Sequence, residues 1–387
     1  MPEKTSPAPV RAAPAELKAS LKKKLAELVR LPGPPGAEGP VIDWLRRAFL
    51  PVSDAVEVDR LGNLYAWRRA AGAAGAAGGA RPLTLMLAAH ADEVGLVVRT
   101  IDERGFIRFE KLGGMADIAV FGRRVLVQGQ IPGVVGMRSA HLTPAEDRDK
   151  APNYRQMYID VGAGSAAAVE AMGIGVGDPV TFAGELQDIG APGGDIVTAK
   201  AIDNRIGCAV ALELFEALQG SSPAGDVCVA ITVQEEVGLR GAAVAAFRVN
   251  PDYALSLDVV AVGDTPDAGS PPVQSARIGA GPALVLASEG GRAGLISHPR
   301  VRRYLEEAAA RAGVPYQKTL TIALGTTDAS AIHLAREGIP SGNLSIPRRY
   351  AHTPIEVLDL NDPAHTVLLL REFVAGMAGH AELGFLS

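Results

Sequence analysis

Strand-like and helix-like segments alternate along the C-terminal half of the chain. Strand-like apolar runs lie at 227–233, 253–257, 282–287, 317–322 and 341–346, and segments with helical apolar spacing lie at 202–218, 301–312, 328–336 and 363–378. Parallel strands need long crossover connections, which helices usually supply. The alternation therefore predicts an α/β fold with a mostly parallel sheet covered by helices.

The segment between residues 94 and 190 has a different character. Short alternating runs such as LVVRTI, FIRFEKL and RRVLVQG follow one another there, separated by glycines. Such runs are typical of a small β-barrel or sandwich. We therefore expect a disordered tail at 1–14, a catalytic α/β domain made of 15–93 and 191–387, and an inserted β-barrel domain at 94–190.

Composition and charge exclude several classes of protein. The net charge of −5 gives no electrostatic basis for binding nucleic acid or an acidic membrane. No apolar run reaches the length of a membrane span, and the N-terminal segment lacks the apolar centre of an export signal. Cys208 and Cys228 both lie in apolar segments, so we interpret them as reduced core thiols of a cytoplasmic protein.

Histidines and carboxylates follow the predicted strands of the sheet. In open α/β sheets the ligands bind at the carboxyl ends of strands, where this chain places His90, Asp92, Asp203, Glu235, Glu236, Asp258 and His352. Each residue alone has an ordinary reading: a core histidine, a helix cap, a turn former, or a solvated pair of glutamates. Together they favour a site for divalent metal ions of the Zn, Co or Mn type.

Spacing within two of these segments adds detail. His90 and Asp92 are two residues apart, so on an extended segment Asp92 can hold the second imidazole nitrogen of a metal-bound histidine. Glu235 and Glu236 are adjacent and point apart on a strand, so one can bind a metal while the other faces a substrate water. Metal-assisted hydrolysis needs this combination of a ligand and a general base.

Motifs along most of the chain resemble those of one known family. The matching pieces include DRLGNLYA, AAHADEVG, GVVGMRSAHLTPAEDRDK, AKAIDNRIGC, VQEEVGLRGA and GTTDASAIHLAREGIPSGNLSIPRRYAHTP. In this respect the chain is similar to the cytosolic, tetrahedral-type metallo-aminopeptidases, the glutamyl (or deblocking) aminopeptidase family, some of whose members carry an endoglucanase label.

The resemblance implies a role for each site residue. Asp203 would bridge two divalent metal ions per subunit, with zinc as our first expectation and cobalt or manganese as alternatives. His90 and Asp258 would complete one metal site, and Glu236 and His352 the other. Glu235 would be the general base, and Asp92 would orient His90. The resemblance also suggests a cis peptide bond after Asp203.

An activity and a set of partners follow from the same resemblance. It implies hydrolysis of peptide substrates at a free N-terminus by a cytoplasmic homo-oligomer, commonly a tetrahedral dodecamer, without nucleic acid or membrane. Two other interpretations stay open: an endoglucanase-like glycoside hydrolase using Glu235 and a partner acid, and an inactive metal-binding scaffold.

The sequence leaves the roles of three features open. The segment 283–297 departs from a stretch where relatives often carry an Asp, which leaves the adjacent substrate wall undefined. Arg348 is interpreted as a solvated loop arginine, with contact to an acidic substrate residue as the alternative. Asp328 is either a helix N-cap or part of a pocket for the substrate amine.

Overall fold

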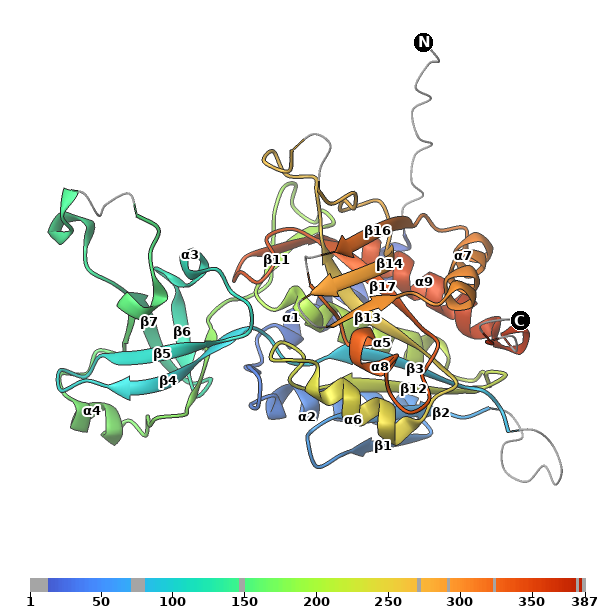
Figure 1. Cartoon of the computed structure of the whole chain (residues 1–387), viewed down its shortest axis with the longest axis horizontal. Coiled ribbons are helices and arrows are strands. Elements are labelled where there is room, and N and C mark those ends of the chain that lie inside the picture. Colours follow the sequence, from blue (N-terminus) through green and yellow to red (C-terminus); the bar gives the residue numbers. More distant parts are fainter. Residues whose placement is uncertain are drawn as a thin grey trace, which may run out of the picture.

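A nine-stranded mixed sheet forms the larger part of the molecule, on the right of Figure 1. The computed structural model describes residues 13–70, 81–145, 150–269, 273–290, 293–322, 325–380 and 383–384. In spatial order the strands are β1 (Ala55–Val58), β2 (Leu64–Arg68), β12 (Asp226–Thr232), β3 (Thr84–His90), β13 (Tyr253–Ala261), β17 (Ser341–Arg348), β14 (Ala283–Gly290) and β15 (Ala293–Ile296), with β16 (Gln317–Ile322) paired to β14.

Parallel pairing is concentrated at the centre of this sheet. Strands β12, β3, β13 and β17 run parallel to their neighbours in this central group. The pairings β1–β2, β2–β12, β14–β17 and β14–β15 are antiparallel, while β16 is parallel to β14. The predicted α/β architecture is confirmed, with the carboxyl ends of the central strands meeting at one edge.

Strand β3 shows why its apolar run is continuous. Leu85, Leu87 and Ala89 belong to the core on one face of the sheet, whereas Met86 and Ala88 belong to the core on the other. Side chains alternate between faces along a strand, so a strand covered on both faces is apolar throughout. The first core is completed by α1 (Ala15–Leu28), α2 (Gly39–Phe49), α5 (Ile202–Ala217), α7 (Pro299–Ala312) and α9 (Asn361–Ala375), and the second by α6 (Arg240–Val249) and α8 (Ala329–Ile332).

Helix α8 is shorter than the helix predicted at 328–336. It ends at Ile332. The next residues form turns in which Arg336 and Gly338 adopt positive φ angles of 56° and 96°. These turns return the chain to β17, and a longer helix would carry it past the start of that strand.

A closed six-stranded barrel forms a separate body on the left of Figure 1. Its strands, in order around the barrel, are β4 (Gly95–Ile101), β5 (Ile107–Leu112), β8 (Tyr158–Asp160), β7 (Ile131–Gly136), β6 (Arg124–Val127) and β9 (Pro179–Phe182). Two short helices, α3 (Asp117–Val120) and α4 (Ala166–Ala171), accompany it. The barrel has its own apolar core. The exact limits of the predicted domains, at 93/94 and 190/191, stay a prediction.

A small three-stranded sheet connects two loops that carry predicted site residues. It consists of β10 (Gln187–Asp188), β11 (Ile196–Ala199) and β18 (Glu356–Asp359). Strand β11 leads into α5, which carries Asp203, and β18 follows the loop that carries His352. Because β11 and β18 are antiparallel neighbours, the two loops are brought together.

Predicted segments fall partly outside the residues that the structure describes. Among the helices in the described part of the chain, none has the length and apolar character that crossing a membrane requires. Of the tail predicted at 1–14, residues 1–12 lie outside the described residues, and so do residues 291–292 of the departing segment 283–297.

Candidate active site

The predicted site residues meet at the carboxyl edge of the central strands. His90 is the last residue of β3, Asp258 lies in the second half of β13, and Glu235 and Glu236 follow β12. They line one cavity of about 380 Å³, together with Asp203, Arg348 and His352. The sheet topology therefore assembles groups that are far apart in the sequence, as expected for an α/β fold.

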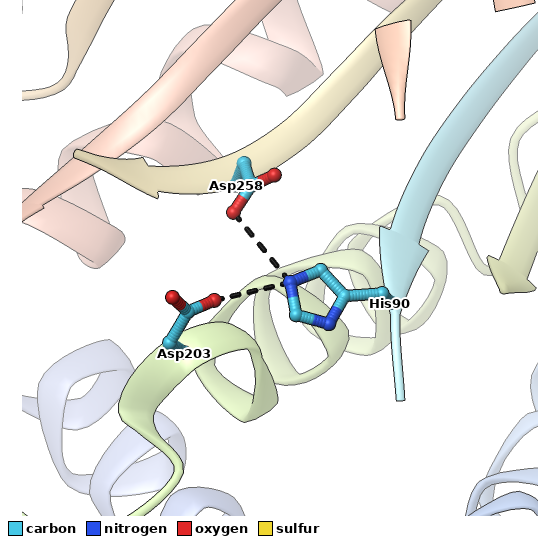
Figure 2. Close-up of side chains that lie close together, drawn as sticks. All are labelled: His90, Asp203 and Asp258. Carbon is cyan, nitrogen blue, oxygen red and sulfur yellow. Dashed lines mark ion pairs between the residues drawn. The ribbon is translucent and has the colours of Figure 1, made fainter. Parts of the chain in front are cut away.

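The first cluster consists of His90, Asp203 and Asp258 (Figure 2). The Nε2 atom of His90 lies 3.0 Å from Oδ1 of Asp203 and 3.8 Å from Oδ1 of Asp258. All three residues are buried. Figure 2 shows the imidazole pointing from the end of β3 toward both carboxylates.

The second cluster consists of Asp203, Glu236 and His352. The Nε2 atom of His352 lies 3.3 Å from Oδ2 of Asp203 and 3.5 Å from Oε2 of Glu236. Asp203 thus faces one histidine with each of its carboxylate oxygens. This is the arrangement of a carboxylate that bridges two adjacent ions.

The geometry of both clusters fits metal binding. Nitrogen and oxygen ligands lie about 2.0–2.2 Å from zinc, so two ligands of one ion are roughly 3–4 Å apart, as these atoms are. Oδ1 of Asp203 and Oε1 of Glu236 are buried and find no hydrogen-bond partner among the described residues. A buried carboxylate oxygen without a partner is costly, and a cation would compensate it.

Both histidines are oriented through their Nδ1 atoms. Nδ1 of His352 lies 2.7 Å from the carbonyl oxygen of Gly114, at the edge of the barrel. A carbonyl only accepts, so Nδ1 donates, and in the neutral imidazole Nε2 keeps a free lone pair. Nδ1 of His90 likewise lies 3.3 Å from the carbonyl oxygen of Asp92 and 3.5 Å from its carboxylate.

The Asp92 carboxylate also accepts two backbone hydrogen bonds, which could not be predicted from its spacing from His90. Its Oδ1 accepts a hydrogen bond from the backbone N–H of Glu235 at 3.0 Å, and its Oδ2 accepts one from that of Glu236, also at 3.0 Å. Asp92 is fully buried. It therefore fixes the backbone of both glutamates in addition to lying beside the imidazole.

Glu235 lies next to the first cluster and belongs to neither cluster. Its Oε2 lies 3.9 Å from Nε2 of His90. Burial raises the pKa of Glu235 well above its usual value, opposed by His90 and reinforced by the Asp258 and Glu236 carboxylates. Burial likewise raises the pKa of Glu236 to about 8, opposed by His352. These carboxyl groups hold protons more tightly than free glutamate does.

The pKa values of the two histidines are raised as well, in their case by the neighbouring carboxylates. Burial lowers the pKa of His352, but the Asp203 and Glu236 carboxylates outweigh it and raise the value to about 10. For His90, the Glu235 and Asp203 carboxylates outweigh burial and raise the pKa well above its usual value. The acids of the cavity thus attract positive charge strongly, which is a second property that suits divalent cations.

Arg348 is buried, so its interpretation as a solvated loop arginine is wrong. Its side chain is 5% exposed; Nη2 donates to Oδ2 of Asp203 at 2.7 Å, and Nε lies 3.0 Å from Oε1 of Glu356. Glu356 in turn accepts from the backbone N–H groups of Asp203 and His352 at 3.0 and 3.1 Å. Strand β17 extends to Arg348, two residues beyond the predicted range 341–346. This extension places Arg348 in the interior.

Sequence reasoning missed Glu356 and Gly114, because nothing in the local pattern marks them. Gly114 and Glu356 each contact a segment distant in sequence, those of His352 and Asp203 respectively. Two other missed residues support the loop that carries the glutamates. Glu38 accepts from the backbone N–H of Gln234 at 3.1 Å, and Asn63 accepts from that of Val233 at 3.1 Å.

Asp328 makes no N-cap hydrogen bond to helix α8. Its Oδ2 instead accepts from the hydroxyl of Thr232, at the end of β12. Burial raises the pKa of Asp328 to about 7, opposed by His90 and by this hydrogen bond. The peptide bond between Asp203 and Asn204 is cis.

Comparison with known proteins gives a consistent result. Residues 72–369 match the M42 glutamyl aminopeptidase family. The glutamyl aminopeptidase of Lactococcus lactis is 31% identical over 92% of this chain and 96% of that protein. An aminopeptidase structure from the archaeon Desulfurococcus kamchatkensis is 35% identical, with a TM-score of 0.85 over 95% of this chain and 98% of that one.

A third similar protein is the TET1 peptidase of Pyrococcus horikoshii, which can assemble into a tetrahedron or a large octahedral shell. It is 29% identical, with a TM-score of 0.78 over 92% of this chain and 99% of that one. The family match covers well over half of the chain, and its relatives are hydrolases of nearly the same length. The chain therefore belongs to the M42 glutamyl aminopeptidase family of metal-dependent aminopeptidases.

Proposed function

We propose that the protein is a dinuclear aminopeptidase that removes the N-terminal residue from peptides. The observation that carries this proposal is the sharing of Asp203 between the two clusters, one oxygen facing each histidine. His90 and Asp258 would hold one ion with Asp203, and Glu236 and His352 the other. When bound, two divalent ions, with zinc as the first expectation and cobalt or manganese as alternatives, would supply Lewis-acid activation of water and of the peptide carbonyl.

Glu235 is the proposed general base. It lies in the cavity, outside both ligand clusters and 3.9 Å from Nε2 of His90. Its side chain would take a proton from the attacking water and return it to the leaving amine. Burial raises its pKa, so the protonated form that must donate to the amine is easier to reach than for a solvated glutamate.

Arg348 and Glu356 are proposed to position the bridging carboxylate. The Arg348 guanidinium contacts Asp203, and Glu356 holds the backbone of Asp203 and of His352. Through these contacts both flanks of the second cluster are fixed to strands β17 and β18. Asp92 fixes Glu235 and Glu236 in the same manner from the end of β3.

The two other interpretations from the sequence have less support. A glycoside hydrolase needs two converging acids about 5–10 Å apart. Its mechanism has no role for the histidines that flank Asp203. An inactive scaffold does not require a glutamate outside the ligand clusters, held by its backbone inside the cavity.

We further propose that the protein acts as a cytoplasmic homo-oligomer. Similar proteins assemble as dodecamers and tetrahedra. Three exposed apolar side chains on the barrel, Ile118 (69%), Phe121 (44%) and Val134 (49%), are suited to be covered by another subunit. Cys208 and Cys228 are buried free thiols, a state that a reducing compartment preserves.

Hydrolysis of paired peptides tests the proposed function. Short peptides with a free N-terminus and the same peptides with an acetylated N-terminus would be incubated with protein stripped of metal and then supplied with Zn, Co or Mn separately. We expect cleavage of the free peptides only, at the first bond and only with metal. Equal cleavage of acetylated peptides, or cleavage of glucans, would contradict the proposal.

A further inference from the structure

One half of the active-site cavity is lined by uncharged side chains. Among the described residues, those that line the cavity beyond the metal clusters, Glu235 and Arg348 are neutral, and they include Val260, Gln274, Val285, Thr321, Asn343 and Ser345. They come from β13, β14, β16 and β17 and from the loop after β13.

The deep part of this neutral half is formed by buried residues. Ser345 is fully buried, and Val285, Asn343 and Gln274 are 2%, 2% and 6% exposed. Other lining residues are accessible: Gly114 and Gly325 are exposed, and His352 and Thr321 are partly exposed. A peptide whose scissile carbonyl lies beside His90 and Glu235 can direct its leaving portion toward these exposed residues and place the side chain of its N-terminal residue in the buried, neutral part.

The absence of charged lining groups among the described residues of this neutral half determines which substrate side chains it can bind. Moving a charged group into a buried site without a countercharge costs several kcal/mol, whereas an uncharged side chain gains free energy there. The charge of Arg348 is already balanced by the carboxylates of Asp203 at 2.7 Å and Glu356 at 3.0 Å, although its Nη1 atom has no hydrogen-bond partner in the described structure. No described carboxylate lines the neutral half to receive a lysine.

Gln274 offers a buried polar group that lacks a hydrogen-bond partner at one end in the described structure. Its Oε1 accepts from the hydroxyl of Thr319 at 2.7 Å, while its Nε2 is buried without a hydrogen-bond partner in the described structure. The Thr319 hydroxyl can donate or accept, so one end of the amide stays free in either orientation. The neighbouring Asn343 is already paired at both ends, with Thr327 and Ser345.

We infer that the enzyme selects an uncharged N-terminal residue, aliphatic or amide-bearing, and that Gln274 is the residue that sets this selectivity. The inference rests on the proposed aminopeptidase function and specifies its substrate class. It differs from the acidic preference that the name of the Lactococcus relative states for that protein. Leucine, methionine and glutamine are expected to be accepted, and glutamate and lysine to be rejected.

Rates with a set of fluorogenic aminoacyl amides test the inference. Wild-type protein is expected to cleave Leu, Met and Gln amides with kcat/KM about 100-fold or more above that for Glu and Lys amides. Gln274→Glu keeps the size of the side chain and places a carboxylate in the neutral half. It is expected to raise the Lys-to-Leu ratio of kcat/KM at least about tenfold. Gln187→Glu, on the exposed strand β10, adds the same charge at the surface and should leave the ratio unchanged.

The outcomes separate the two proposals. Cleavage with Glu or Lys preferred, or an unchanged ratio in Gln274→Glu, would overturn the inference and leave the aminopeptidase function standing. If no unblocked substrate is cleaved, the proposed function fails and binding decides the inference. Free leucine and glutamine should then raise the melting temperature more than glutamate or lysine does, and equal shifts would overturn it.

Discussion

The Asp92 carboxylate accepts one hydrogen bond from each of two successive backbone N–H groups, those of Glu235 and Glu236. It also lies 3.5 Å from Nδ1 of His90. One buried side chain therefore constrains a histidine of the first cluster, a glutamate of the second and the proposed base. At the residue scale, positions in the site depend on a few such shared contacts.

Replacing Asp92 with asparagine should disturb all three positions. An amide can accept from only one of the two N–H groups, and its NH₂ would face the other donor. We expect metal affinity to fall by about 10–100-fold, with a lower kcat. Asp102→Asn is a matched control, because Asp102 also accepts from two backbone N–H groups, in the β4–β5 turn. Metal-buffered titration and rate measurement check the prediction; equal effects of both variants would contradict it.

The site residues could be predicted unequally from the sequence. His90, Glu235, Glu236, Asp258 and His352 follow or end apolar runs, and strand exits converge in such a fold. Arg348 was misjudged because its segment resembles a polar loop, whereas in the structure it is the last residue of β17. Burial of that arginine depends on the carboxylates of Asp203, 145 residues away, and of Glu356 on the next strand, which the polar segment around Arg348 does not reveal.

At the scale of elements, a buried ionic cluster joins the barrel to the sheet. Glu93, directly after the site segment of β3, pairs with Lys200 at 2.6 Å. The same carboxylate accepts from Thr181 of barrel strand β9 at 2.9 Å and from the backbone of Gly33 at 3.1 Å. Arg205 of α5 lies 3.5 Å away. These contacts join four segments of the chain, those that contain Gly33, Glu93, Thr181 and Lys200.

Breaking this cluster should destabilise the protein strongly. Lys200→Met removes the main countercharge of Glu93, and uncompensated burial of a charge costs about 3–5 kcal/mol. We expect a loss near the lower end in the free energy of unfolding, because Arg205 remains. Lys22→Met breaks the exposed pair with Asp188 and should cost at most about 1 kcal/mol. Chemical denaturation measures both losses, and similar values would refute the role of the cluster.

Elements with strong apolar periodicity were predicted well. The strand at 317–322 has the predicted limits, and the helix at 202–218 differs by one residue. The helix at 328–336 was overestimated because its apolar spacing continues through turns that the path to β17 requires. Local pattern describes which face is buried, whereas the end of an element depends on where the chain must go next.

At the scale of the whole molecule, the cavity is completed where the barrel meets the sheet. The carbonyl oxygen of Gly114, in the loop after β5, accepts a hydrogen bond from Nδ1 of His352. The barrel thus takes part in the site as well as providing the surface proposed for assembly. The sequence predicted the barrel from its short alternating runs, but the contact with His352 could not be anticipated without a fold.

The proposed assembly predicts a particle much larger than one 40.1 kDa chain. Size-exclusion chromatography with light scattering should give about twelve times that mass for wild type. Ile118→Lys adds a charge to the exposed apolar surface of the barrel and should shift the protein toward smaller species. Val244→Lys, at a 42% exposed site on α6, is the control. A wild-type protein that stays monomeric at micromolar concentration would contradict the proposal.

The role of Glu235 as general base is tested by the rate of peptide hydrolysis by Glu235→Gln loaded with metal. Because Glu235 lies outside both ligand clusters, we expect unchanged metal content and KM, with kcat lowered by about 100- to 10,000-fold. Glu337→Gln, on the exposed segment after α8, should match wild type. Hydrolysis by Glu235→Gln at a rate close to wild type would contradict the assignment of Glu235 as the base.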